Sequence, residues 1–455
     1  MRKPLPGNAF RRSTTTLLPH PRPVIGITAL FALACSSTGA LTDGSSPTSY
    51  YSPAELRYDD RTYDPDIHTV QLFRSGFELG APVIELGSDQ TLDLRFDDWK
   101  PTIQDLNYTV EHCTHDWRPS DMSKGEYLQG AFSDLIATPR QSYTTYRTFF
   151  MYTLTWPNAM MRPLRSGNYL VKVFRNGDED DLVLTRRFMI TEKRVDIAAQ
   201  VVATRHVDLR DVAQQVDLTI SHPGLDIPDP FSDLHVTVLQ NMNWNDARTG
   251  LKPKFVRNNE LIYDHPPQAE FMGLNEFRNF DLKDLNYPTQ YVGRITNSDP
   301  MQEAIIVPQP ARNIHVYLQE PEINGRYLVR NDFVDGDPLG ADYVGVNFTL
   351  TMPDQLYGGA VYVWGGLSDF ACRKEFRMTW DEQHHRYFLH VPLKQGWYDY
   401  MYAFLPDNGD RPDIDRIEGS HFETENDYAV LVYFSDPMQR CDRLVGVRFV
   451  NSRKG

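Results

Sequence analysis

Residues 166–192 read SGNYLVKVFRNGDEDDLVLTRRFMITE, two alternating runs around a polar turn. Tyr169–Phe174 and Leu182–Ile190 alternate with the period of two that is typical of β-strands. Asn176-Gly177 lies between them, and glycine takes positive φ at little cost. The four acids Asp178, Glu179, Asp180 and Asp181 follow, and burying them together would be costly. The sequence therefore predicts a hairpin with a solvated acidic tip that closes a β-domain.

The rest of the chain repeats this pattern of short alternating runs bounded by turn residues. At 455 residues it is too long for one hydrophobic core. Aromatic residues make up 12%, with 31 Pro and 28 Gly, and helical periodicity longer than two turns is nearly absent. We therefore predict an all-β fold of tandem immunoglobulin-like β-sandwich domains. The expected ranges are an N-terminal domain at 66–193, a middle domain at 194–312 and a C-terminal domain at 313–452.

The N-terminal 35 residues are typical of a signal peptide. Basic residues precede an apolar run, Val24–Ala34, which is too short to span a bilayer. The run ends in Ala-Leu-Ala-Cys35, which resembles a bacterial lipobox, so we expect lipidation of Cys35. Secretion without a lipid, by cleavage after Ala34, is the alternative. Residues 36–65 are rich in Ser, Thr, Gly and Pro and predict a flexible linker. The expected location is the periplasm, with a tether to the outer membrane through Cys35.

Two polar clusters raise the question of a metal. Glu111, Cys113 and His115 alternate along one segment and are metal ligands in type, but no C-x-x-C partner exists. A polar cluster at a strand end is the favoured interpretation. The acidic run 178–181 could attract calcium, although its spacing is not that of an EF-hand. A solvated loop, or a loop that contacts a partner, fits it better, and no cofactor is predicted.

Several function classes find no support in the sequence. There is no G-x-S-x-G, no H-E-x-x-H and no phosphate-binding glycine loop, so we predict a protein that is not an enzyme. The net charge of −15 disfavours nucleic-acid binding. Cys372 and Cys441 could form a disulfide in an exported protein, but the sequence does not show whether they come within reach.

The C-terminal range contains an aromatic pattern around Trp364 and Trp397. It resembles early-set immunoglobulin-like domains related to glycogen-binding modules, some of which stack exposed aromatic rings on sugars. Core positions for Trp364, Trp397 and Tyr402 are the favoured interpretation, because large aromatic residues dominate sandwich interiors. An exported lipoprotein that binds glycans through this domain is kept as the alternative function, and a glycan partner is not favoured.

A set of short runs spread over residues 66–450 forms a pattern that is specific in combination. The runs are 66–73 (DIHTVQLF), 82–87 (PVIELG), 111–113 (EHC), 116–117 (DW), 166–170 (SGNYL), 184–188 (LTRRF), 238–241 (VLQN), 244 (W), 251–253 (LKP), 275–278 (NEFR), 418–426 (EGSHFETEN) and 442–446 (DRLVG). Taken together, they resemble the type IX secretion system plug protein family of Bacteroidota. The resemblance implies a plug that seals the periplasmic side of the outer-membrane translocon barrel, which would be its partner.

Overall fold

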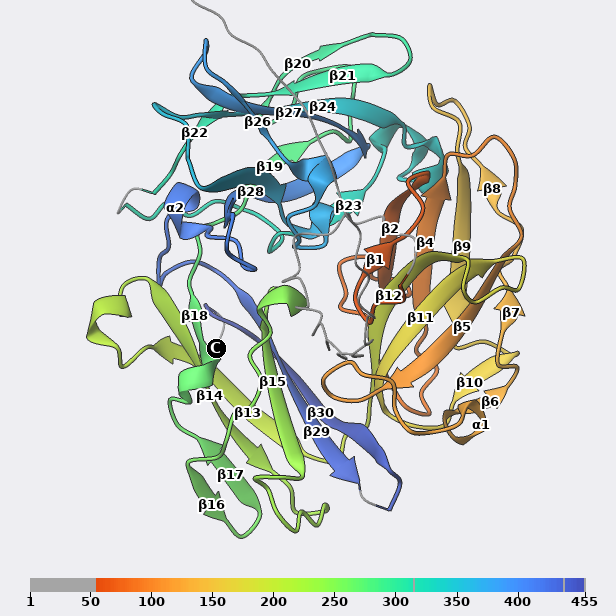
Figure 1. Ribbon diagram of the computed structural model, residues 1–455, viewed down its shortest axis with the longest axis vertical. Coiled ribbons are helices and arrows are strands. Elements are labelled where there is room, and N and C mark those ends of the chain that lie inside the picture. Colours follow the sequence, from red (N-terminus) through yellow and green to blue (C-terminus); the bar gives the residue numbers. More distant parts are fainter. Residues whose placement is uncertain (1–54, 314–315, 437, 454–455) are drawn as a thin grey trace, which may run out of the picture. The chain divides into compact units, whose positions relative to one another are not determined.

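The computed structural model describes residues 55–313, 316–436 and 438–453, all within one compact unit. Its ribbon consists almost entirely of strands (Figure 1), which confirms the all-β prediction. The α-helices of the described part, α1 (Lys124–Tyr127) and α2 (Asp415–Glu418), have four residues each. None of the described helices is long and apolar enough to cross a membrane. The predicted signal peptide and Cys35 lie outside the described residues.

The first sandwich is built around the predicted hairpin. Strands β11 and β12 pair antiparallel, with Tyr169 opposite Phe188, and Gly177 takes a φ of +75° in the turn. One sheet has the order β1-β12-β11-β5-β7 with β3 beside β12, and the other has the order β2-β4-β9-β8. The strands are β1 (Arg61–Thr62), β2 (Ile67–Arg74), β3 (Val83–Glu85), β4 (Leu92–Asp98), β5 (Leu106–Cys113), β6 (Leu128–Gly130), β7 (Asp134–Leu135), β8 (Arg140–Gln141), β9 (Phe150–Trp156), β10 (Met161–Pro163), β11 (Gly167–Arg175) and β12 (Leu182–Thr191).

Both faces of this hairpin are buried. Tyr169, Val171 and Val173 point into the core of the first sandwich. Leu170 and Met189 point the other way, into a cluster shared with Leu239, Leu431, Tyr433 and Leu444 of the middle sandwich. The alternation therefore marks two different interiors rather than a core and a solvent face.

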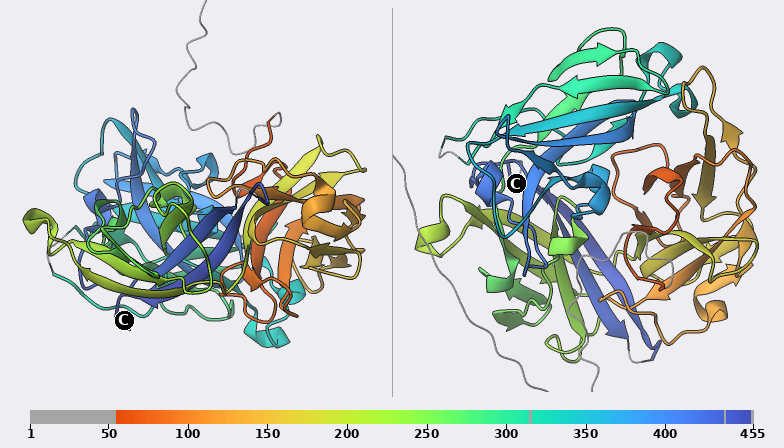
Figure 2. Two further views of the ribbon diagram at one scale, coloured as in Figure 1. Left: turned by 90° about the horizontal axis from the view of Figure 1, so that it is seen from below. Right: turned by 45° about the horizontal axis from the view of Figure 1, so that its top comes forward.

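The middle sandwich takes strands from two distant parts of the chain. Its larger sheet has the order β13-β14-β17-β16, with β18 beside β14, and its smaller sheet has the order β15-β29-β30. The blue strands β29 and β30 lie beside the green strands of this sandwich in Figures 1 and 2. The strands are β13 (Asp196–Ala203), β14 (Ala213–Ser221), β15 (Leu234–Gln240), β16 (Phe255–Arg257), β17 (Glu260–Tyr263), β18 (Glu270–Met272), β29 (Asp427–Asp436) and β30 (Cys441–Asn451).

The third sandwich likewise crosses a predicted boundary. Strands β19 and β21 come from the range 194–312 but pair with β28 and β24 of the range 313–452, and β20 pairs with β21. The strands are β19 (Arg278–Asp281), β20 (Val292–Thr296), β21 (Gln302–Ile306), β22 (Gln309–Pro310), β23 (Tyr327–Val329), β24 (Tyr343–Thr351), β25 (Gly359–Trp364), β26 (Thr379–Asp381), β27 (Arg386–Lys394) and β28 (Gly396–Pro406).

Strand pairing therefore divides the chain differently from the expected ranges. We propose a middle domain of 195–272 with 427–451, and a third domain of about 278–406 that is inserted between the two parts. The physical reason is that a strand edge is satisfied by whichever strand the tertiary fold brings beside it, however distant in sequence.

The predicted linker also needs correction at its end. Of the range 36–65, residues 55–65 are described, and β1 pairs with β12. Tyr63 donates its backbone N–H to the Val183 carbonyl at 2.8 Å, and its side chain is buried. This segment covers part of the outer edge of β12, which would otherwise expose unpaired backbone groups.

Candidate functional site

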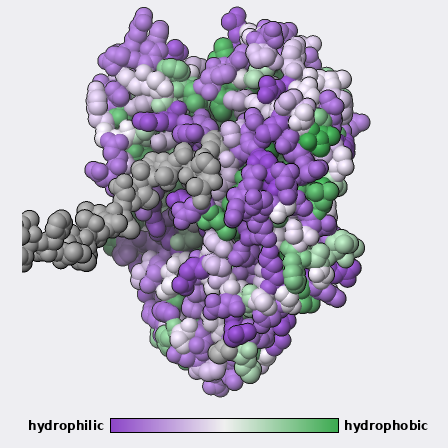
Figure 3. Space-filling model, turned by 45° about the vertical axis from the view of Figure 1, so that its right-hand side comes forward, coloured by the Kyte–Doolittle hydropathy of each residue, from purple (hydrophilic) through white to green (hydrophobic). Residues whose placement is uncertain are grey.

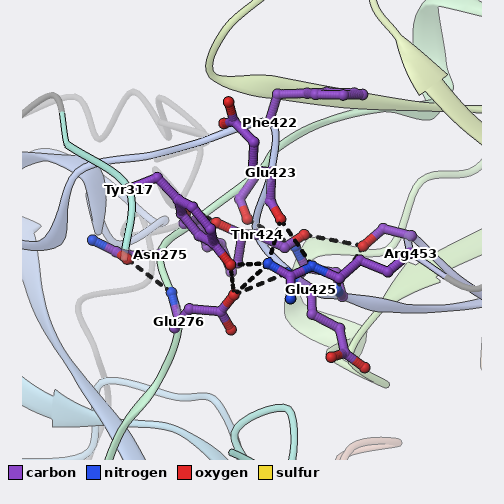
Figure 4. Close-up of polar contacts among 12 residues, drawn as sticks. Asn275, Glu276, Tyr317, Phe422, Glu423, Thr424, Glu425 and Arg453 are labelled. Carbon is purple, nitrogen blue, oxygen red and sulfur yellow. Dashed lines mark hydrogen bonds and ion pairs between the residues drawn. The ribbon is translucent and has the colours of Figure 1, made fainter. Parts of the chain in front are cut away.

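Two of the runs that carry the family resemblance, 275–278 and 418–426, meet at one place between the middle and third sandwiches. We call it the polar junction and define it by residues 274–278, 418–426 and 451–453. Figure 4 shows the side chains of Glu276, Tyr317 and Arg453 directed toward one another across it. The segment 274–278 precedes the other two by more than 100 residues, so the tertiary fold assembles them.

Glu276 is the buried acid at the centre of this junction, with 1% of its surface exposed. It accepts a hydrogen bond from the Tyr317 hydroxyl and pairs with the Arg453 guanidinium at 3.4 Å. Burial raises the pKa of Glu276, and the Tyr317 hydrogen bond and Arg453 oppose that rise. The group is therefore a fixed acceptor that ties the C-terminal residues to the start of the third sandwich.

A second acid, Glu418, forms a buried ion-pair cluster with two arginines. Its carboxylate lies 2.9 Å from Arg278 Nε and 2.9 Å from Arg312 Nε, and its side chain is fully buried. Burial alone would raise the pKa of Glu418, but the two guanidinium groups hold it below its usual range. The Tyr402 backbone N–H also donates to it at 2.8 Å. Such a paired, hydrogen-bonded charge specifies one geometry, and losing one partner would leave the others buried and uncompensated.

Amide side chains complete the polar junction. Asn426 donates to the Gly273 carbonyl at 2.7 Å and accepts from Asn241 at 2.7 Å. Gln214 donates to the carbonyls of Phe422 and Thr424. The bonds from Gln214 satisfy backbone carbonyls of the irregular segment 420–426, in which Ser420, His421, Thr424 and Asn426 are buried.

A second junction joins the first and third sandwiches. Lys394 lies 2.6 Å from Asp97, and both side chains are almost fully buried. The Tyr343 hydroxyl donates to the same carboxylate at 2.8 Å, and Lys394 Nζ lies 4.0 Å from the centre of the Phe149 ring. Burial raises the pKa of Asp97 and lowers that of Lys394, so each group relies on the other to stay charged.

A third junction joins the first and middle sandwiches. His115 donates its backbone N–H to Asp442 at 2.8 Å, and its ring stacks on His235 with centroids 3.7 Å apart. Burial lowers the pKa of His235, and the neighbouring His115 lowers it further. The Glu192 N–H donates to the Leu444 carbonyl at 2.8 Å beside this contact. The first and middle sandwiches are thus joined by backbone as well as side chains.

Next to these junctions, Glu322 in the turn 322–326 forms a carboxyl pair with Asp399 of β28. Asp399 is fully buried and accepts backbone N–H groups of Ile323 and Gly325 at 2.6 and 3.2 Å. Burial raises the pKa of Asp399 to about 6 and that of Glu322 to about 10, and the proximity of the two acids adds to the rise for Glu322. The pair therefore holds a proton at neutral pH. It positions Arg326, which reaches Asp427 at 2.8 Å and the Leu79 carbonyl.

The residues considered as metal ligands do not converge. Glu111 pairs with Lys172 at 3.0 Å, and Cys113 is buried in the cluster between the first and middle sandwiches. His115 turns to Asp442. Because the three side chains have separate contacts, the arrangement fits the interpretation as a polar cluster.

The acidic tip is partly neutralised by its own domain. Glu179 pairs with Lys124 at 2.9 Å and Lys172 at 3.0 Å, and these contacts lower its pKa although burial alone would raise it. Asp181 pairs with Arg175 at 2.9 Å. Asp178 and Asp180 are exposed and take part in none of the ion pairs among the described residues. Among the four acids of the tip, Asp178 and Asp180 are therefore the two whose charge is not offset by an ion pair within the described residues.

The proposed disulfide is absent from the described part of the chain, where Cys372 and Cys441 are both free thiols. Cys441 packs in the core of the first sandwich, and Cys372 packs beside Phe277 and Trp364 in the third. Burial raises the pKa of Cys441 to about 11 and that of Cys372 to about 12. The prediction assumed one domain for both residues, whereas β30 leaves the third sandwich.

Another cluster was not anticipated from the sequence. Asp217, Asp264 and His265 come close enough to hold a metal ion. However, Lys254 and Arg205 already pair with Asp264 at 2.5 and 3.1 Å. In the sequence, the adjacent Asp264 and His265 are possible metal ligands, but no sequence pattern places Asp217 of β14 beside them.

Comparison with known proteins agrees with this fold. Residues 67–192 match the family model described as type 9 secretion system plug protein 1st domain. No curated protein matches the chain. The crystal structure of a hypothetical protein from Parabacteroides merdae ATCC 43184 is 28% identical, with a TM-score of 0.84 over 87% of this chain and 100% of that one. A DNA-bound alkylpurine DNA glycosylase AlkC from Pseudomonas fluorescens aligns over 28% of this chain and 30% of that one, at 10% identity and a TM-score of 0.16.

Proposed function

Because residues 67–192 carry the first domain of the type 9 secretion system plug family, we propose that this protein is a plug of that system. In this proposal it binds the outer-membrane translocon barrel from the periplasm, seals it, and performs no enzymatic reaction. Residues 1–35 direct export, and a lipid on Cys35 holds the protein near the outer membrane. Such a tether raises the effective concentration of the plug beside its barrel.

The observation that supports a sealing role is the way the three sandwiches are joined. Each pair of sandwiches shares a polar contact to a buried carboxylate: Glu276 with Arg453, Asp97 with Lys394, and Asp442 with His115. Buried ion pairs are intolerant of displacement, because separating the partners leaves charges in a medium of low dielectric. A plug must resist deformation across a pore, and these contacts make the three sandwiches resist it together.

The surface suits a reversible contact. Figure 3 shows a largely hydrophilic face on which hydrophobic side chains form small, separate areas. Interfaces that form and dissociate are no more apolar than the rest of the surface. Within the first sandwich we propose Asp178 and Asp180 as contact residues for a basic site on the partner.

Affinity capture tests the proposal directly. The tagged full-length protein, cross-linked in native outer membranes, is expected to recover a very large barrel protein. Asp178→Asn with Asp180→Asn is expected to lower recovery about tenfold, since two charge contacts are lost. The matched control is Asp208→Asn with Asp226→Asn, the same charge change at exposed acids of the middle sandwich.

The possible outcomes test the plug role and the acidic contact residues separately. Recovery of the barrel by both variants would reject the acidic tip while leaving the plug role intact. Failure of the wild-type protein to recover any barrel would reject the plug role. A deletion strain gives a second readout. When cargo loading is blocked, an unsealed translocon should admit into the periplasm a small dye that does not cross the intact outer membrane.

A further inference from the structure

Two histidine rings from different sandwiches lie face to face where the first and middle sandwiches meet. His115 follows β5 of the first sandwich, and His235 lies on β15 of the middle one. Their ring centroids are 3.7 Å apart, and the ring planes differ by 5°. Both side chains are half-buried, so protons from solvent can reach the rings. This contact therefore contains two imidazole groups, the side chains that change charge most readily in the physiological pH range.

One carboxylate serves both rings. An ionised carboxylate accepts hydrogen bonds, so His115 Nδ1–H donates to Asp442 Oδ2 at 2.7 Å. The Ser435 hydroxyl donates to the other oxygen of Asp442 at 2.5 Å. Because that hydroxyl hydrogen is used, the Ser435 oxygen accepts from His235 Nε2–H at 3.0 Å. In the neutral state the two rings are therefore different tautomers, and further protons would bind at His115 Nε2 and His235 Nδ1.

The surroundings of the stack balance one positive charge better than two. Burial alone would raise the pKa of Asp442, but hydrogen bonds from His115 and Ser435 hold it below its usual range, so its charge persists in acid. Asp116 is a second acid near His235, but it already pairs with Arg118 at 2.8 Å. The titratable groups that face the rings or Asp442 are Asp116, Lys252, His112, Tyr433 and Cys441. Lys252 adds positive charge, so a second proton on the stack is poorly compensated.

We propose that the His115–His235 stack is an acid-sensitive latch between the first and middle sandwiches. When both rings are protonated, two positive charges face each other at 3.7 Å, and their repulsion is relieved when the rings separate. Separation draws Asp442 of β30 away from His115, which is its partner on the first sandwich. The proposal is independent of the plug role.

The backbone contacts beside the latch should loosen with it. The Glu192 N–H donates to the Leu444 carbonyl at 2.8 Å, and the Arg194 N–H donates to the Val445 carbonyl at 2.9 Å. Leu444 and Val445 follow Asp442 on β30, so a shift of Asp442 reaches them directly. In acid the junction should therefore open locally while each sandwich keeps its own core.

The direction of the pH dependence follows from His235. Burial lowers the pKa of His235, and the neighbouring His115 lowers it further. The closed junction therefore takes up the second proton less readily than the separated sandwiches do. The latch is closed above the ordinary histidine pKa of about 6.5 and opens as the pH falls below that value.

Hydrogen–deuterium exchange of the intact protein, corrected for the intrinsic effect of pH, tests the latch. We expect protection of the Glu192 and Arg194 N–H groups to fall about tenfold between about pH 7 and 5, while the β11–β12 ladder stays protected. His235→Phe keeps a ring that cannot be protonated, and His235→Gln keeps a donor for Ser435. Either variant should remove most of the fall.

The matched control is His206→Phe, the same substitution at an exposed histidine of the middle sandwich that pairs with Glu270 at 2.8 Å. It should leave the fall unchanged. Equal falls in the wild type and both His235 variants, or loss of the fall in His206→Phe, would overturn the proposal. Loss of protection across β11–β12 at the same pH would also overturn it, because the acid effect would then be global unfolding.

NMR of the His235 Cε1–H group gives a second measurement. In His115→Phe the pKa of His235 should rise, because a group that lowers it has been removed. An unchanged pKa would show that the two rings do not share charge and would contradict the latch.

Discussion

Several titratable residues of this molecule are buried at domain contacts, so their protonation state affects the free energy of unfolding. The half-buried His68 and the fully buried His112 both have a pKa lowered to about 4, chiefly by loss of solvent around the ring. The carboxyl pair of Glu322 and Asp399 shows the opposite effect, with both pKa values raised by burial. Each group disfavours its charged form in the folded state, so stability depends on pH in a direction that can be worked out.

The histidines make the protein acid-sensitive. Their folded pKa lies below the unfolded value near 6.5, so their contribution is complete above that pH and is lost as pH falls toward 4. For His112 the loss is about 1.4 kcal/mol per pH unit between those limits. His112→Asn should therefore flatten the fall in unfolding free energy between pH 7 and 5, measured by urea titration. The exposed His384→Asn serves as control, and an unchanged slope for His112→Asn would contradict the assignment.

For Glu322 we predict the opposite dependence of stability on pH. Its folded pKa lies above that of an ordinary glutamate, so its contribution is complete below pH 4.5 and declines as pH rises. Glu322→Gln keeps a neutral donor beside Asp399 without this cost. The variant should gain stability over the wild type by up to about 1.4 kcal/mol per unit between pH 5 and 8. Glu260→Gln, at an exposed position, should show no such trend. A gain that does not depend on pH would rule out the shared proton.

At the scale of elements, short segments rather than long strands hold the sandwiches together. Helix α2 has only four residues, yet it ends in Glu418, which contacts Arg278 on β19 and the backbone of β28. The segment 419–426 then carries the chain back to the middle sandwich. Its irregular backbone is specified by side-chain amides rather than by a strand ladder.

Removing the charge of Glu418 tests that role. Glu418→Gln leaves Arg278 and Arg312 buried with an incomplete partner, so the free energy of unfolding should fall by about 3–5 kcal/mol. Glu126→Gln, which breaks the exposed pair with Arg440, should cause a much smaller loss. Equal losses for the two variants in urea denaturation would show that Glu418 is not a structural centre.

At the scale of the whole molecule, the middle sandwich is completed by strands that follow the third sandwich in the sequence. Strand β29 pairs with β15 across seven residue positions, and Val430, Val432 and Val445 contribute to the middle core. The C-terminal hairpin also contacts the first sandwich through Leu444. This hairpin therefore couples the folding of all parts.

Fragments can test that connectivity. The fragment 194–312 lacks β29 and β30 and should remain unfolded, because its smaller sheet would be reduced to one strand. Residues 195–273 joined to 426–453 by a Gly/Ser linker should fold. Backbone amide dispersion in NMR spectra distinguishes the two. Cooperative folding of 194–312 alone would support the original domain boundary instead.

Local pattern was sufficient for the elements of this protein. Alternation at 169–174 and 182–190, with Asn176-Gly177 between them, predicted the β11–β12 hairpin because side-chain direction and turn geometry depend on adjacent residues. The combination of short motifs also indicated the plug family, and the match at 67–192 supports it. The acidic tip was placed correctly, but its internal pairs with Lys124 and Lys172 were not visible.

Which strands pair, and which sites result, depended on contacts between distant residues. The choice of β15 as a partner for β29 joins positions almost 200 residues apart, and no local pattern encodes it. For the same reason Cys372 and Cys441 were assigned to one domain, and neither the polar junction nor the His115–His235 stack could be predicted. The periodicity of a strand depends on its own residues, whereas the strands that pair with it depend on the burial and hydrogen bonding of the complete fold.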